Sequence, residues 1–208
     1  MTAYTLFTNP MSRGQIARWA LHEAGVAYDQ VLVDWADKPA ALRAANPMGK
    51  VPTLIHRSET GERVVTECAA ICAYLAESEP AAGLLPSDAE LADYYRWMFF
   101  AAGPLEQAIV SRSMNWEVPK EREGMVGFGS LERVLDTLDG HFSAHDFVCG
   151  PRFTMADVYV GSQIDWGLTF GSIPPRETFV AYAERNQARA AYKAAKAIDY
   201  QLIQKAKK

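Results

Sequence analysis

In the stretch Asn46-Pro47-Met48-Gly49-Lys50-Val51-Pro52-Thr53-Leu54, a proline directly precedes a predicted strand. Proline cannot donate a hydrogen bond to a β-ladder, so a proline at this place requires an unusual backbone geometry. A cis peptide bond between Val51 and Pro52 would turn the N–H and C=O of Val51 outward, toward an extended peptide ligand. The alternative is an ordinary trans-proline at the start of a strand.

The sequence on both sides of this stretch predicts a small α/β domain. Hydrophobic periodicity and turn residues predict strand 4–8, helix 12–24, strand 28–33, helix 39–45, strands 53–56 and 63–65, and helix 67–77. The first β-α-β unit must be parallel and the later hairpin antiparallel, so the four strands form a mixed sheet. This order predicts a thioredoxin-like N-terminal domain over residues 1–79.

The second half of the chain predicts an all-α bundle. Two prolines and a glycine in segment 80–87 argue against a regular element, so we expect a linker there. The later apolar patterns predict helices 89–115, 124–142, 154–168, 177–185 and 187–198. Residues 88–208 would then be the helical domain, ending in a surface helix with a frayed tail.

Composition excludes several classes of protein. With 208 residues, 49% hydrophobic and 22% charged, the chain is in the range of ordinary globular proteins. A net charge of −4 disfavours a nucleic-acid partner. We see neither a secretory signal nor an apolar run of about 18 residues, so we expect no membrane partner. Three cysteines without metal-ligand spacing suit a reducing compartment, and the cytoplasm is the expected location.

A second segment, Thr66-Glu67-Cys68, follows a predicted strand and opens a helix. The free N–H groups of a helix N-terminus attract a carboxylate, and the Glu67 carboxylate would attract an ammonium group. Together these groups suit the zwitterionic head of a γ-glutamyl peptide. The alternative is a simple helix cap followed by a first-turn acid.

Several passages resemble the cytosolic glutathione transferase superfamily, and the likeness to serine-type bacterial members extends over nearly the whole chain. The passages are 46–54 and 66–77, 12–28 around the first helix, 94–104, and the capping-box sequence Thr154-Met155-Ala156-Asp157. The resemblance implies a transferase fold, with a thioredoxin-like domain that binds glutathione and a helical domain that shapes the electrophile pocket. It also implies a homodimer.

The resemblance assigns roles along the glutathione molecule. Pro52 would be the cis-proline, and the backbone of Val51 would pair with the cysteinyl part. Glu67 and position 68 would hold the γ-glutamyl head. Serine or threonine is usual at that position, whereas this chain has Cys68. Its main-chain N–H can still bind a carboxylate, and its thiol is either redox-active or a small buried side chain.

Two cations are candidates for the glycyl carboxylate of glutathione. Lys50 lies in the proline loop, and Arg13 stands at the start of the first helix. Asn46 suits the carboxylate less well. A solvated loop lysine is the alternative interpretation of Lys50.

The chemistry implied by the family is attack by the glutathione thiolate. A thiol with a pKa of about 8.5 is only about 3% ionised at pH 7, and lowering that pKa by two units requires about 2.7 kcal/mol. One charge-assisted hydrogen bond and a helix N-terminus can supply this. Ser12 is the candidate donor, although its hydroxyl could instead cap the helix. Asn9, loop N–H groups and, less well placed, Tyr4 are further candidates.

The electrophile pocket is the least determined part of the site. Met11, Trp35 and Trp97 are its candidate lining residues, and they suggest a small hydrophobic electrophile. Reduction of a hydroperoxide is an alternative reaction. We expect no metal and no cofactor, with glutathione as a co-substrate. A non-catalytic glutathione-transferase-like binding scaffold is the competing function. A thiol-disulfide oxidoreductase is disfavoured, because no cysteine stands at the start of the first helix.

Overall fold

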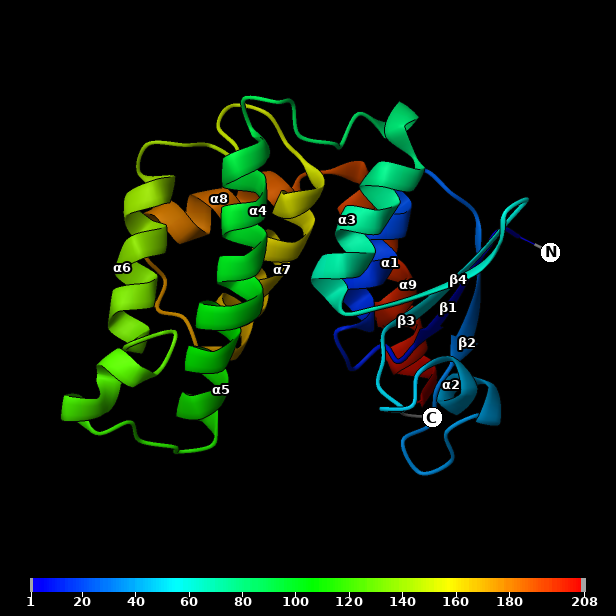
Figure 1. Cartoon of the computed structure of the whole chain (residues 1–208), viewed down its shortest axis with the longest axis horizontal. Helices are drawn as coiled ribbons and strands as arrows, with labels where there is room; N and C mark the ends of the chain where they lie inside the picture. Colours follow the sequence, from blue (N-terminus) through cyan, green and yellow to red (C-terminus); the bar gives the residue numbers. More distant parts are fainter. Residues whose placement is uncertain (1, 207–208) are drawn as a thin grey trace. The chain divides into compact units, whose positions relative to one another are not determined.

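The computed structural model describes residues 2–206, which form two units (Figure 1). The first unit contains the described residues up to Leu85 together with those from Ala188 onward. The second unit is Pro86–Gln187. The sheet and the candidate glutathione-binding segments belong to the first unit.

The first unit contains a four-stranded sheet in the order β2-β1-β3-β4. Its strands are β1 (Tyr4–Thr8), β2 (Tyr28–Leu32), β3 (Thr53–Ser58) and β4 (Gly61–Thr66). β1 and β2 run parallel, whereas β3 is antiparallel to both β1 and β4. The mixed sheet predicted from the sequence is therefore confirmed.

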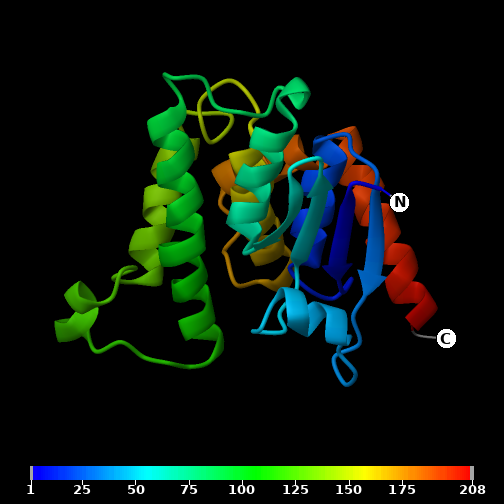
Figure 2. The same ribbon diagram turned by 45° about the vertical axis from the view of Figure 1, so that its right-hand side comes forward.

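Helices cover both faces of this sheet, as Figures 1 and 2 show. They are α1 (Gly14–Glu23), α2 (Ala40–Ala45) and α3 (Cys68–Ser78). On one face, Leu42 of α2 packs with Phe7, Val33 and Ile55 in a buried cluster. Side chains alternate along a strand, so Leu6 and Leu54 point to the opposite face, which α1 and α3 cover.

The last helix, α9 (Ala190–Ala206), packs along α1 in the first unit. The predicted division, which assigned 88–208 to the helical domain, therefore differs from the structure at its C-terminal end. Most of α9 is exposed or half-buried, as expected of a surface helix, but Asp199 is 1% exposed and forms an ion pair with the fully buried Arg18. A buried guanidinium requires a partner charge, and α9 supplies it. Residues 207 and 208, part of the predicted frayed tail, lie outside the described residues.

The second unit is helical, as predicted. Its α-helices are α4 (Leu91–Phe100), α5 (Glu106–Ser113), α6 (Leu131–Phe142), α7 (Met155–Phe170) and α8 (Glu177–Gln187). α4 and α5 are joined through the π-helical turn η2 (Ala101–Leu105), which contains Pro104. Proline has no N–H for the ordinary i→i−4 bond, and a π turn at this position keeps the predicted long helix continuous.

Two local expectations about regular structure are wrong. The boundary between the units falls inside the expected linker 80–87, but this segment contains the 3₁₀-helix η1 (Pro80–Ala82), since proline is well suited to the first position of a helical turn. The predicted helix 124–142 begins only at Leu131. The residues before it form the 3₁₀-helix η3 (Lys120–Met125) and a turn in which Gly129 has a φ of 63°. Ser130 then caps α6 through its side chain.

The predicted capping box at the start of α7 is confirmed. The Asp157 carboxylate accepts hydrogen bonds from the backbone N–H and hydroxyl of Thr154, from the N–H of Val148 and from the hydroxyl of Tyr182. Burial raises the pKa of Asp157 to about 6, although these hydrogen bonds favour its charged form. Asp157 therefore has a structural role. Among residues 2–206, no helix is long and apolar enough to span a membrane.

Candidate functional site

Strand register brings the two predicted ligand segments to one edge of the sheet. Thr53, which follows Pro52, pairs with Phe7 near the end of β1 and with Thr66 at the end of β4. The loop after β1, the start of β3 and the start of α3 therefore lie side by side. Three segments that are far apart in the sequence form one candidate site within the first unit.

Ser12 lies in the loop between β1 and α1 and is half-buried. Its Oγ donates to the backbone oxygen of Asn9 at 2.6 Å and accepts from the N–H of Gly14 at 3.0 Å. A hydroxyl has a single proton to donate, so Ser12 must release the Asn9 oxygen before it can donate to a thiolate. The capping role and the catalytic role thus use the same hydroxyl.

Asn9 and Gly14 fix the shape of this loop. The Asn9 amide donates to the Val33 backbone oxygen at 2.9 Å, and its Oδ1 accepts from the N–H of Met11 at 2.8 Å. The Asn9 side chain is therefore engaged in shaping the loop. A Cβ at Gly14 would collide with Thr8 Oγ1, so only glycine allows α1 to approach β1 so closely.

Tyr4, another candidate for thiol activation, already donates its hydroxyl proton to a different residue. Its hydroxyl donates to Glu79 Oε1 at 2.6 Å, and the side chain is 2% exposed. Burial and the neighbouring Glu79 raise the pKa of Tyr4, which makes its hydroxyl a poorer donor to a thiolate. It also lies at the start of β1, at the opposite end of the strand from Ser12.

The Val51–Pro52 peptide bond is cis, as predicted from the sequence. Asn46 shapes the preceding loop: its Nδ2 donates to the Lys50 backbone oxygen at 3.2 Å and to Thr53 Oγ1 at 3.1 Å. The Val51 side chain packs against the apolar cluster around Phe7 and Ile55. Asn46 is 6% exposed and is committed to these contacts rather than to a ligand.

Three cationic side chains are candidates for the glycyl carboxylate. Lys50 is exposed, and Arg13 is exposed at the start of α1. Lys38 is a third cation that sequence reasoning missed: a Cβ built on Gly49 would lie 3.9 Å from its Nζ. Eleven residues separate Lys38 from Lys50 in the sequence, and no motif links them, so only the fold shows that Lys38 lies beside Gly49.

The start of α3 has an unusual backbone. Glu67 is exposed and has a φ of 65°, outside the helical region, and α3 begins at the next residue. The first N–H groups of a helix have no partners within that helix, and a helix N-terminus favours an anion. Cys68 is 8% exposed, and its Sγ lies 3.6 Å from the backbone oxygen of Arg13, which links the starts of α3 and α1.

The three candidate pocket residues differ in exposure. Met11 is 69% exposed and Trp35 is 51% exposed, both in the first unit. Trp97 is 2% exposed on α4, where its ring packs against His141, at a centroid distance of 4.3 Å, and against Phe100. Trp97 thus packs within the helical unit, whereas Met11 and Trp35 present apolar surface to solvent.

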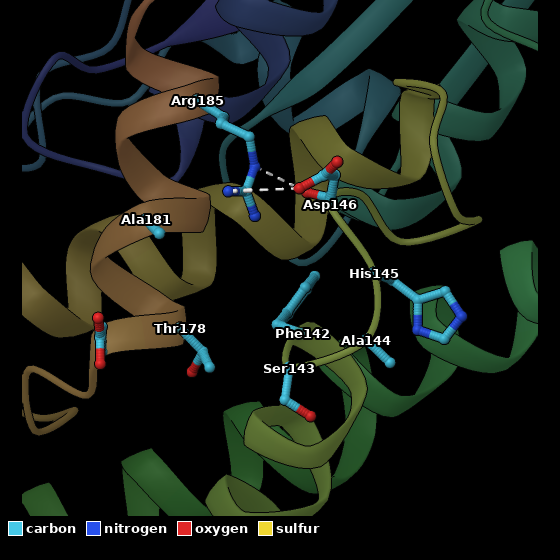
Figure 3. A pocket seen from close by; sticks show the side chains of 9 residues that line it. Phe142, Ser143, Ala144, His145, Asp146, Thr178, Ala181 and Arg185 are labelled. Carbon is cyan, nitrogen blue, oxygen red and sulfur yellow. Dashed lines mark hydrogen bonds and ion pairs between the residues drawn. The ribbon is translucent and has the colours of Figure 1, made fainter.

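The helical unit has a separate pocket of about 440 Å³ between the end of α6 and α8 (Figure 3). Its lining residues are Phe142, Ser143, Ala144, His145, Asp146, Glu177, Thr178, Ala181 and Arg185. Several of its polar groups are already engaged. Arg185 pairs with Asp146, Thr178 donates to Asp139, and Ser143 donates to the Gly140 oxygen. Nothing in this arrangement identifies a ligand.

Two family models match this chain. "Glutathione S-transferase, N-terminal domain" matches residues 11–78, and "Glutathione S-transferase, C-terminal domain" matches residues 107–166. Together they account for more than half of the sequence. The first match includes the loop of Ser12, the cis-proline and the start of α3.

Known proteins agree with these matches. Glutathione S-transferase GstA of Escherichia coli O157:H7 is 29% identical over 167 residues, which cover 77% of this chain and 81% of that protein. The structure of a glutathione transferase from Methylococcus capsulatus str. Bath has a TM-score of 0.77 at 28% identity, covering 95% of this chain and 99% of that one. A sphingomonad glutathione S-transferase complexed with glutathione has a TM-score of 0.74 at 26% identity, with coverage of 94% and 98%.

Three findings indicate the same family: the mixed sheet, the cis-proline beside the start of α3, and the family matches in both units. The chain therefore belongs to the glutathione S-transferase superfamily.

Proposed function

We propose that this glutathione transferase binds glutathione along the edge formed by the Ser12 loop, Pro52 and the start of α3. It would activate the thiol for attack on a small hydrophobic electrophile or for reduction of a hydroperoxide. One observation carries the proposal: the register of Thr53 with Phe7 and Thr66 brings the three segments together.

Each part of the tripeptide has a chemically matched partner in the proposed complex. The N–H groups at the start of α3 receive the γ-glutamyl carboxylate, and the Glu67 carboxylate receives the ammonium group. The main chain of Val51 pairs with the cysteinyl residue as a short antiparallel strand. Lys38 and Lys50 provide positive charge for the glycyl carboxylate, since Lys50 lies in the proline loop and Lys38 lies beside Gly49 of the same loop.

Ser12 is the proposed catalytic residue. In the structure its hydroxyl donates to Asn9, and a thiolate would compete for that proton as a stronger, charged acceptor. Rotation of the hydroxyl alone accomplishes the exchange, because Oγ can keep accepting from Gly14. The nearby start of α1 adds the favourable field of a helix N-terminus.

A binding and turnover experiment tests this function. Wild type, Ser12→Ala and Ser12→Thr would be applied to immobilised glutathione and assayed with an aryl halide and a hydroperoxide. We expect all three to bind glutathione, and Ser12→Ala to lose about 100-fold in kcat, as expected when one charge-stabilising donor is removed. Ser12→Thr keeps a hydroxyl and is the matched control. Its activity should exceed that of Ser12→Ala.

The outcomes separate the competing functions. Failure of the wild type to bind glutathione would overturn the proposal. Binding without turnover of either substrate would instead indicate a non-catalytic scaffold. Full activity of Ser12→Ala would move thiol activation to main-chain groups of the loop. A Cys68→Ala variant tests the redox alternative, and we expect it to stay active because the main-chain N–H at position 68 remains.

The proposal includes a homodimer. On α4, three large apolar side chains are exposed at helical spacing: Leu91 at 44%, Tyr95 at 44% and Phe99 at 71%. Such a stripe on a monomer marks a surface for a partner, here a second copy of this chain. Light scattering of the purified protein should give twice the mass of one chain, and the mass of a single chain would contradict this part.

A further inference from the structure

α9 and α1 are connected by polar and aromatic contacts over the length of α1. Arg189, just before α9, forms two hydrogen bonds of 2.7 Å with Glu23, and the ring of Tyr192 meets Trp19 edge to face at 5.0 Å. Further along α9, Lys196 contacts Gln15. Numbers rise along α9 as they fall along α1, so the two helices run antiparallel, with Lys196 near the start of α1.

The contact at the start of α1 continues into the candidate catalytic loop. Lys196 Nζ donates to Gln15 Oε1 at 2.8 Å, and Gln15 Nε2 donates to the Pro10 backbone oxygen at 2.5 Å. Pro10 is two residues before Ser12. A hydrogen-bonded chain thus leads from the C-terminal helix, through one amide, to the loop proposed to activate the thiol.

Lys196 determines which way the Gln15 amide faces. An ammonium group has only donors, so the amide must turn its oxygen toward Lys196 and its NH₂ toward the Pro10 oxygen. A flipped amide would set a donor against a donor and an oxygen against an oxygen. The charge of Lys196 therefore keeps Gln15 in the orientation that restrains the loop.

The same loop is fixed from the other side by the sheet. Asn9 donates to the Val33 oxygen, and its backbone oxygen receives the Ser12 hydroxyl. The contact from Gln15 falls on Pro10, between Asn9 and Ser12. Release of this contact would let the backbone of the loop shift, and a shift of that kind misplaces the Ser12 donor relative to the thiol.

We propose that Lys196 and Gln15 are positioning residues, through which the C-terminal helix holds the Pro10–Ser12 backbone in the geometry needed for thiol activation. This inference rests on the proposed glutathione transferase function. Neither residue needs to touch glutathione. Their effect should therefore appear in kcat and in the ionisation of the bound thiol rather than in the KM for glutathione.

The test compares Lys196→Met, Gln15→Met and Lys196→Arg with the wild type. Lys196→Met and Gln15→Met should lower kcat about threefold to tenfold, the range expected for one lost hydrogen bond, with little change in KM. The pH profile of kcat should shift to higher pH in both, because the thiolate is less stabilised. Lys196→Arg keeps a charged donor and should restore most of the activity.

Arg189→Met is the matched control. It loosens the same helix at the end remote from the loop and should lower the free energy of unfolding while leaving kcat and its pH profile unchanged. Equal losses of kcat in Arg189→Met and Lys196→Met would overturn the proposal, because α9 would then act only through overall stability. Unchanged kcat and pH profile in Gln15→Met would also overturn it.

A second measurement makes the result independent of turnover. Hydrogen exchange of the backbone amides of Met11 and Gly14 should become faster in Lys196→Met and Gln15→Met but not in Arg189→Met. If the wild type proves inactive, the proposed function fails, yet the exchange data still decide whether Lys196 and Gln15 hold the loop. Unchanged exchange in both variants would reject the positioning role in either case.

Discussion

Glu67 shows how a single residue can be both strained and useful. Its φ of 65° and ψ of 123° lie in a region that side chains avoid, because Cβ crowds the backbone there. A glycine would adopt the same conformation without that cost. The chain has glutamate at this place, and the proposed complex uses its carboxylate to hold an ammonium group.

Two variants separate the strain at Glu67 from its charge. Glu67→Gly should raise the free energy of unfolding by about 0.5 to 1 kcal/mol, since the relief of strain exceeds the added entropy of the unfolded chain. Glu67→Gln keeps the strain and should leave stability unchanged. Both should weaken glutathione binding about tenfold or more, because a charged hydrogen bond is lost.

Chemical denaturation and glutathione titration measure the two effects. A loss of stability in Glu67→Gly would show that the side chain has a structural contact that outweighs its strain. Unchanged binding in both variants would remove Glu67 from the proposed site.

Sequence alone identified most of the candidate residues but not how their atoms are used. Ser12, Pro52 and Glu67 follow from their places before and after predicted strands. That the Ser12 hydroxyl already donates to Asn9 depends on the path of the loop backbone, which no local pattern specifies. Lys38 and Gln15 were missed for the same reason, since their partners lie at Gly49, Pro10 and Lys196.

At the level of elements, the first turn of α7 contains a buried carboxylate, that of Asp157. Asp157 is fully buried and has a pKa raised to about 6, mainly by loss of hydration. A group whose pKa is higher in the folded state binds its proton more tightly there. Its contribution to stability is therefore greatest below the pKa of the unfolded chain and is lost as pH rises through about 6.

Wild type compared with Asp157→Asn should show this dependence. As pH falls from about 7 to about 5, the wild type should gain about 1 kcal/mol of unfolding free energy relative to the variant. Burial also raises the pKa of Asp199, so other groups contribute to the same trend, and the difference between the two proteins isolates Asp157.

Urea unfolding at several pH values provides the measurement. The variant should be less stable than the wild type throughout, because the NH₂ of the introduced amide would face N–H groups that now donate to the Asp157 carboxylate. A parallel pH dependence in the two proteins would contradict the raised pKa.

Local sequence patterns, such as capping residues and apolar periodicity, predicted helices and strands well where these patterns were strong. The capping box predicted the start of α7, and alternating apolar residues predicted β1. They failed over residues 124–130, which were predicted as the start of a helix but end η3 and form a turn at Gly129 with positive φ. The π turn at Pro104 was also not predicted, because it depends on how α4 and α5 continue one another.

At the scale of the whole chain, the N-terminal helix α1 and the C-terminal helix α9 pack together in the first unit. Arg18 of α1 is fully buried; its Nε donates to Asp199 of α9 at 2.9 Å, and its Nη1 donates to Tyr28 and Gln30. Arg18 and Asp199 are 181 residues apart. Loss of one partner would leave an uncompensated charge in the interior, which is far more costly than loss of both.

A double-mutant cycle tests the contribution of the Arg18–Asp199 ion pair to stability. Asp199→Asn should lower the free energy of unfolding by about 3 to 5 kcal/mol, because Arg18 stays buried without its counter-charge. Arg18→Met combined with Asp199→Leu should recover most of that loss, since two apolar side chains of similar volume replace the pair. Chemical denaturation of the wild type, both single variants and the double variant gives the coupling energy.

A loss below about 1 kcal/mol in Asp199→Asn would indicate that α9 contributes little to the first unit. A double variant less stable than Asp199→Asn would show that the pair itself, rather than avoidance of a lone charge, stabilises the fold.

The sequence by itself determined the order of strands and helices, the mixed sheet, the unusual proline before β3 and the helical second half. These features depend on residues close together in the chain, through periodicity, capping and the missing N–H of proline. Only the tertiary structure decided that α9 belongs with the sheet, that Ser12 shares its hydroxyl with Asn9, and that Lys196 reaches the Pro10 loop through Gln15. These contacts join distant residues, and their geometry is fixed only when the whole unit packs.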